Sequence, residues 1–95
     1  MDAYQKAFIL IKASPGHERE VVNDLMGIDE VKEAHVIPGK WDVMAVVDFQ
    51  KDVSIQSDRR VYDLVQEKIA KISHMLDTNT MVSYYSRSNA AAAIR

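Results

Sequence analysis

Two segments of the chain are apolar at nearly every position, which is the pattern of strands buried on both faces. The first is Ala7–Ala13, where Ile9 and Ile11 fall on one alternating face and Phe8 falls on the other. The second is Trp41–Phe49, whose two alternating faces are apolar as well. Because only a central strand is covered on both sides, we expect both segments in the middle of a sheet.

Two other segments carry apolar residues at the spacing of a helix. The first, His17–Met26, follows Ser14, which we expect to be the N-cap with Pro15 at the first helical position, and Gly27 ends it. The second covers about Arg59–Ile72. The apolar positions are Val21, Val22, Leu25 and Met26 in the first helix and Val61, Leu64, Val65, Ile69 and Ile72 in the second. Each helix therefore has an apolar stripe that can pack against a sheet.

Two more polar segments complete the set of strands. Val31–Ile37 is interrupted by polar residues, as is typical of an edge strand, and Pro38–Lys40 can connect it to the next strand as a hairpin. The last strand runs from about Met75 to Tyr85. The order β-α-β-β-α-β predicts the ferredoxin-like α+β fold, an antiparallel four-stranded sheet with two helices on one face. Right-handed crossovers place the first and third strands in its middle.

That arrangement leaves one face of the sheet without a helix, although this face also carries large apolar side chains. An exposed apolar patch of that size usually marks an interface. We therefore expect a dimer in which two sheets pack face to face in an α/β-barrel-like assembly.

The composition is that of a small globular protein. The chain has 95 residues, of which 47% are hydrophobic and 27% are charged. We expect one domain over residues 1–85. Residues 86–95 have no amphipathic pattern, and we interpret them as a mobile tail or a short appended helix.

Charge and residue usage exclude several classes of function. A net charge of −2 means that the chain has no excess of positive charge for binding nucleic acid. The absence of cysteine excludes disulfides and thiolate metal sites. The apolar runs are too short to span a membrane, and no signal peptide is recognisable. We expect a cytoplasmic protein.

Four short motifs follow one another along the chain. Ser14–Val21 contains a Pro-Gly-x-Glu-x-x-Val pattern, Ile28–Val36 leads into a strand, Gly39–Val43 has a Gly-x-aromatic-Asp-apolar pattern, and Thr78–Thr80 is Thr-x-Thr. In this order, across Ala7–Val82, they resemble the effector-binding domain of the Lrp/AsnC family of feast-or-famine regulators. One departure is Ser73-His74-Met75, where the family often has a Pro-Gly-Val-like turn.

The resemblance implies dimers that assemble into larger rings, with small effectors, typically amino acids, held at contacts between dimers. Family members place a helix-turn-helix domain ahead of this unit, whereas only six residues precede the first strand here, so the sequence looks like the stand-alone form. We expect a homo-oligomer without a cofactor that binds an amino acid and modulates transcription. It would act with a full-length regulator of the same family and without binding DNA itself.

Carried over residue by residue, the resemblance places the effector site at Gly39, Trp41 and Asp42 in the turn and at Thr78 and Thr80 on the last strand. Asp42 would accept hydrogen bonds from an ammonium group, while backbone amides at Gly39 and the threonine hydroxyls would donate to a carboxylate. Simpler explanations stand beside this hypothesis. Glycine and aspartate suit tight turns, Trp41 can pack in a core or an interface, and threonine is a good strand former.

The three histidines, His17, His35 and His74, are not at the spacing of metal ligands, so we expect no metal site. The predicted topology places His35 and His74 at opposite edges of the sheet, where only assembly could unite them. The alternative function is a small dimeric enzyme of the monooxygenase or isomerase type, which the same fold supports. Its general base would have to be His35 or Asp42.

Overall fold

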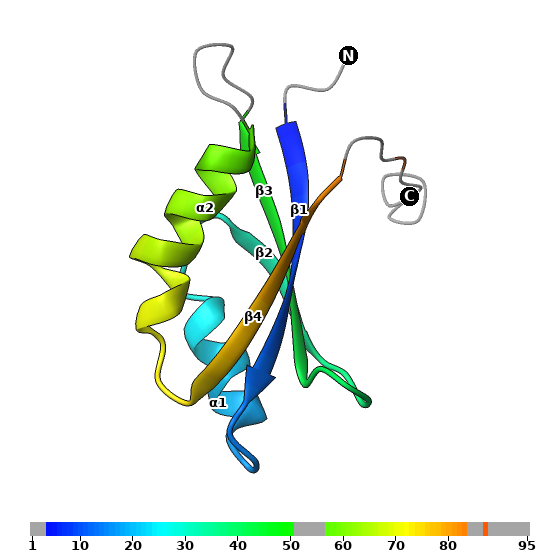
Figure 1. The fold of residues 1–95 in the computed structure, drawn as a ribbon, viewed down its shortest axis with the longest axis vertical. Coiled ribbons are helices and arrows are strands. Elements are labelled where there is room, and N and C mark those ends of the chain that lie inside the picture. The colour runs from blue at the N-terminus through cyan, green and yellow to red at the C-terminus, as the bar shows by residue number, and fades with distance from the viewer. Residues whose placement is uncertain (1–3, 51–56, 84–86, 88–95) are drawn as a thin grey trace, which may run out of the picture.

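The computed structural model describes residues 4–50, 57–83 and 87, and its elements have the predicted order (Figure 1). The strands are β1 (Tyr4–Ala13), β2 (Val31–Val36), β3 (Val43–Gln50) and β4 (Met75–Val82). The helices are α1 (Glu18–Leu25), α2 (Ser57–Glu67) and the 3-10 turn η1 (Ile69–Lys71). The predicted tail lies outside the described residues except for Arg87, as do Tyr84 and Tyr85 at the predicted end of the last strand.

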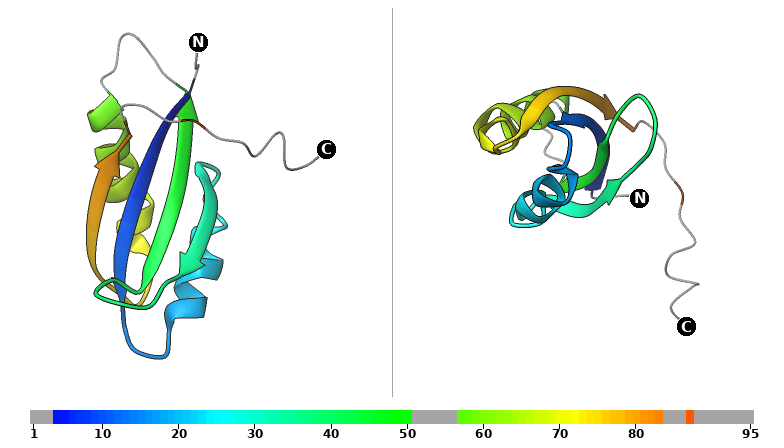
Figure 2. Two further views of the ribbon diagram at one scale, coloured as in Figure 1. Left: turned by 90° about the vertical axis from the view of Figure 1, so that its right-hand side faces the viewer. Right: turned by 90° about the horizontal axis from the view of Figure 1, so that it is seen from below.

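The predicted ferredoxin-like topology is confirmed. The strands are antiparallel in the order β2-β3-β1-β4, so the two strands that are apolar on both faces occupy the middle. Both helices lie on the same side of the twisted sheet (Figure 2). No helix among the described residues is long and apolar enough to cross a membrane.

The core lies between the sheet and the two helices. On the helix side, Ala7, Ile9 and Ile11 of β1 are paired with Val47, Ala45 and Val43 of β3, and all six are 0% exposed. The helices and the 3-10 turn add Val21, Leu25, Leu64, Val65 and Ile69. Removing these side chains from water is the dominant favourable term in folding.

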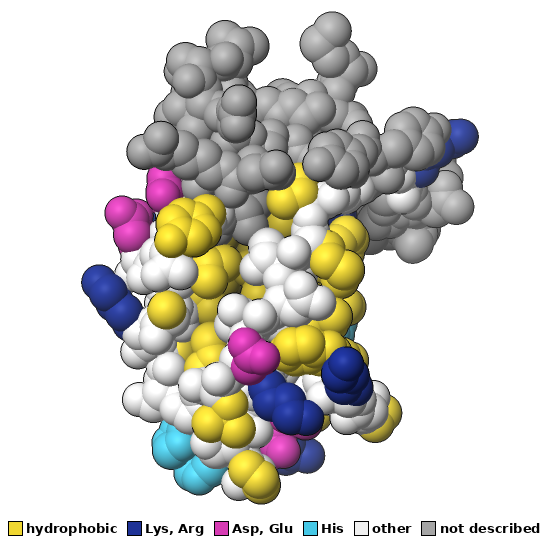
Figure 3. All heavy atoms as spheres, in the orientation of Figure 1, with side chains coloured by type: hydrophobic (Ala, Val, Ile, Leu, Met, Phe, Trp, Pro, Cys, Tyr) yellow, Lys and Arg dark blue, Asp and Glu magenta, His cyan; other side chains and the backbone are white. Residues whose placement is uncertain are grey.

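The opposite side of the sheet, which we call the open face, is apolar as predicted. Strand alternation and pairing place Phe8, Leu10, Met44, Val46 and Met81 there. The left panel of Figure 2 looks onto this face, with both helices behind the sheet. Hydrophobic side chains reach the surface on this side of the molecule, at the right of Figure 3, and Met81 is 45% exposed.

The prediction that Ser14 is the N-cap of α1 was wrong. Residues 14–17 form a β-turn, in which the His17 N–H donates to the Ser14 carbonyl at 3.0 Å. Gly16 has φ of 87°, a left-handed conformation outside the helical range, and Pro15 before it completes the pattern of a type II turn. The N-cap is His17, and α1 starts at Glu18.

The prediction of one continuous helix up to Ile72 was also wrong. Helix α2 ends at Glu67, and the tighter 3-10 turn that follows buries Ile69 completely. Between them, the Lys68 Nζ donates to both carboxylate oxygens of Glu30, at 2.9 and 3.1 Å. These hydrogen bonds raise the pKa of Lys68. The pair is accessible to water, so its contribution to stability is small; the part that comes from Lys68 is present at neutral pH and is lost as the pH rises through its raised pKa, above the ordinary value of 10.5.

Truncation of the central strand tests the position of the core. We expect Ile9→Ala to lower the free energy of unfolding by about 2–5 kcal/mol, because it opens a cavity at a fully buried position. Leu76→Ala, at a side chain that is 63% exposed, is expected to change it by less than about 0.5 kcal/mol. Urea unfolding at one protein concentration measures both. Similar losses for the two variants would contradict this description of the core.

Candidate functional site

The connection between β2 and β3 carries three of the five residues that the sequence indicated. The Ile37 N–H donates to the Asp42 carbonyl at 2.8 Å and closes the loop. Gly39 has φ of 124°, and a Cβ built there would have no atom within 4 Å, so open space adjoins its backbone. Trp41 is half-buried and precedes β3, whereas the sequence had predicted it as the first residue of that strand. It is not part of the buried core formed by the described residues.

Asp42 holds the end of β1. Its backbone N–H donates to the Ile11 carbonyl at 3.0 Å, and the Ala13 N–H donates to its carboxylate Oδ2 at 2.9 Å. The pairing of β1 with β4 shifts register between Lys12 and Ala13, so the carboxylate takes a donor at this irregularity. Within the described residues, Oδ1 has no further hydrogen-bond partner, and a carboxylate can accept several donors. The Asp42 side chain is thus held in place by Oδ2, while Oδ1 can still accept a hydrogen bond.

Thr78 and Thr80 lie on β4, on the helix side of the sheet. Thr78 pairs with Ile11 and Thr80 with Ile9, and residues paired across antiparallel strands share a face. Both threonines are half-buried. The Thr78 N–H donates to the Asp77 Oδ1 at 2.8 Å, at the edge of the sheet.

The five residues therefore form two groups at one end of the sheet. Ile11 pairs with Val43, the residue after Asp42, on one side and with Thr78 on the other. Two strand spacings, about 10 Å, separate the backbones of the two groups. Within one chain, strand β1 stands between them.

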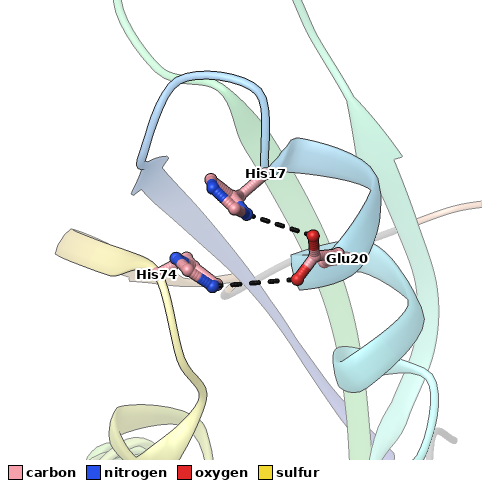
Figure 4. A group of neighbouring side chains, drawn as sticks. All are labelled: His17, Glu20 and His74. Carbon is pink, nitrogen blue, oxygen red and sulfur yellow. Dashed lines mark hydrogen bonds and ion pairs between the residues drawn. The ribbon is translucent and has the colours of Figure 1, made fainter.

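A group that sequence spacing did not predict lies near the start of α1 (Figure 4). The rings of His17 and His74 stack with centroids 3.7 Å apart and planes within 8°. The Glu20 carboxylate reaches both rings, with Oε1 3.1 Å from His17 Nδ1 and Oε2 3.7 Å from His74 Nε2. The feature that could have predicted this group is the antiparallel pairing of β1 with β4. It places the residues that follow β1 beside those that precede β4.

The third histidine is separate from this group. His35 lies on β2, and its Nε2 is 2.9 Å from the Glu33 Oε1 in a pair whose side chains are 49% and 57% exposed. Strands β2 and β4 are at opposite edges, so the predicted separation of His35 from His74 is correct. His35 and Asp42 were the two residues considered as the general base of an enzyme. In the structure, His35 is paired with Glu33, and Asp42 accepts a hydrogen bond from the Ala13 N–H.

The chain is similar to one protein family over most of its length. The model of the Lrp/AsnC ligand binding domain matches residues 6–89. An uncharacterised HTH-type transcriptional regulator from Pyrococcus furiosus is 31% identical over 81 residues, which are 82% of this chain and 50% of that protein. The chain thus spans about half the length of the curated relative that it matches.

Solved structures have the same fold. A hypothetical protein from Pyrococcus horikoshii is 32% identical, with a TM-score of 0.70 over 86% of this chain and 92% of that one. A transcriptional regulator from Neisseria meningitidis, solved as a complex with L-Met, has a TM-score of 0.69 over 88% of this chain and 52% of that one. It is 15% identical, so this second likeness concerns the fold alone.

Two substitutions at Asp42 separate its structural contact from its charge. We expect Asp42→Ala to lower the free energy of unfolding by about 1–3 kcal/mol, because the Ala13 N–H loses its acceptor. Asp42→Asn is expected to stay within about 1 kcal/mol of the parent, because the amide oxygen can accept the same bond. Urea unfolding compares the three proteins. A stable Asp42→Ala variant would mean that this contact does not hold the end of β1.

Proposed function

This chain belongs to the Lrp/AsnC ligand-binding domain family, and from that membership we propose that it binds an amino acid and thereby modulates transcription. The family and the regulator that it matches support a regulatory, effector-binding role. The Neisseria meningitidis regulator of the same fold was solved with L-Met, which supports an amino acid as the class of effector.

The single observation that carries the proposal is the held orientation of Asp42, three residues after Gly39 in the same loop. The Ala13 N–H fixes Oδ2, which leaves Oδ1 to accept hydrogen bonds from an ammonium group. The exposed backbone at Gly39 has open space beside it, so a ligand can approach it closely. A charged acceptor and an accessible backbone in one loop suit the two ends of an amino acid.

We place the effector at a contact between dimers. The loop group, Gly39, Trp41 and Asp42, is separated from Thr78 and Thr80 by β1 within one chain. A neighbouring molecule can bring its own copy of one group against the other. In this arrangement the ligand stabilises the assembly that completes its site, by linkage between binding and association.

The dimer itself would form through the open face. Its apolar side chains would be covered by the same face of a second copy, an isologous contact that closes on itself. The net charge of −2 supports a partner other than DNA, which we propose to be a full-length regulator of the family. In this proposal the domain binds its ligand without chemical turnover.

Light scattering after chromatography, with and without each amino acid, tests the effector. We expect one amino acid to shift the mass distribution of the protein and to raise its melting temperature. Asp42→Asn should abolish both effects while keeping the fold, and Asp63→Asn, at an exposed position of α2, should keep both. A parent protein indifferent to every amino acid would contradict the proposal, as would an Asp42→Asn variant that still responds.

A charge on the open face tests the dimer. We expect Leu10→Glu to yield a monomer, because a carboxylate would be buried unpaired between the two sheets. Met26→Glu, at a residue after α1 that is 49% exposed, should leave the mass unchanged. Sedimentation of both variants distinguishes the surfaces. If Leu10→Glu remained dimeric and folded, the open face would not be the interface.

A further inference from the structure

We propose that His17, Glu20 and His74 form a binding site for a divalent transition metal ion, with Zn²⁺ as the typical occupant. The group supplies two imidazoles and one carboxylate, and their ligand atoms all lie within 4.8 Å of one another. This is a donor set that zinc accepts in four-coordinate sites that keep one position for water.

The donors lie close enough to reach one ion after a small rearrangement. Zinc bonds to nitrogen and oxygen of about 2.0–2.2 Å place neighbouring tetrahedral ligand atoms about 3.3–3.6 Å apart. Glu20 Oε1 is 3.1 Å from His17 Nδ1 and Oε2 is 3.7 Å from His74 Nε2, so each carboxylate oxygen faces one ring, and side-chain rotation would bring the three ligand atoms around one ion. His17 and Glu20 are three positions apart at the start of α1, a spacing that puts both on one side of a helix.

The backbone at His74 is the second observation. This residue has φ of 68°, the one described non-glycine residue with positive φ. Its carbonyl accepts the Ser14 N–H at 2.9 Å, and the next residue, Met75, pairs with Ala13. The turn that leads into β4 thus holds His74 at positive φ, and its imidazole lies stacked on that of His17.

The contacts within this group are weak by themselves. The side chains of His17, His74 and Glu20 are 38%, 37% and 61% exposed, and contacts between groups so accessible to water stabilise a fold very little. A metal ion that bonds to all three would hold them together far more strongly. The positive end of the α1 dipole opposes a cation, and the carboxylates of Glu18 and Glu20 in the first turn offset it.

Metal binding requires the stack to open. The two rings are nearly parallel, whereas imidazoles bound to one tetrahedral ion direct their lone pairs toward a common point. Both side chains are more than a third exposed, so the rings have room to rotate. Because the site is not preformed, we expect a dissociation constant on the order of 1 μM.

Calorimetric titration of the untagged full chain with ZnCl₂ at a pH of about 7.5 tests the site. We expect one ion per chain. His17→Asn, Glu20→Gln and His74→Asn should each weaken binding by at least about tenfold, since losing even an indirect partner of a metal ligand costs that much.

Two features of the variants keep the result interpretable. Asparagine tolerates positive φ, so His74→Asn removes the ligand without changing the backbone preference, and circular dichroism checks its fold. His35→Asn is the matched control, because it removes an exposed histidine next to a carboxylate elsewhere on the sheet. The proposal is overturned if His35→Asn weakens binding as much as His74→Asn, if one ion binds per two chains, or if the parent binds no tighter than the three variants.

Discussion

The central position of β1 is the constraint on which the rest of this structure depends. Its residues pair with β3 on one side and β4 on the other, and its helix-facing side chains are fully buried. Because strand side chains alternate between faces, a slip of one residue would move Ile9 and Ile11 to the open face. The register of β1 therefore decides at once which residues form the core and which remain for an interface.

The end of β1 also positions both candidate sites. The Ala13 N–H binds the Asp42 carboxylate, and the N–H of the next residue, Ser14, binds the His74 carbonyl. Two consecutive amides thus connect Asp42, and the turn that carries His74, to one strand. The irregular backbone here, a register shift together with positive φ at Gly39 and His74, lies where the regular ladder ends. Loops held by a rigid sheet are the usual place for binding residues.

The two sites differ in chemistry although they share this end of the fold. Asp42 and the backbone at Gly39 combine a carboxylate with an accessible backbone, as the proposed amino-acid site requires. His17, His74 and Glu20 combine two imidazoles with a carboxylate, as the proposed metal site requires.

The sequence by itself determined the element order, the central strands, the helix-covered face and the apolar open face, because strand and helix periodicity depend on local spacing alone. The resemblance of its motifs also indicated an effector site at Gly39, Trp41, Asp42, Thr78 and Thr80, which stays a prediction. Local patterns could not show that Pro15-Gly16 would form a turn and move the cap to His17, or that the second helix would tighten at Ile69. Only the tertiary structure decided that Asp42 binds Ala13 and that His17 meets His74. Those contacts join residues 29 and 57 positions apart, and strand pairing, which acts through space, is what brings them together.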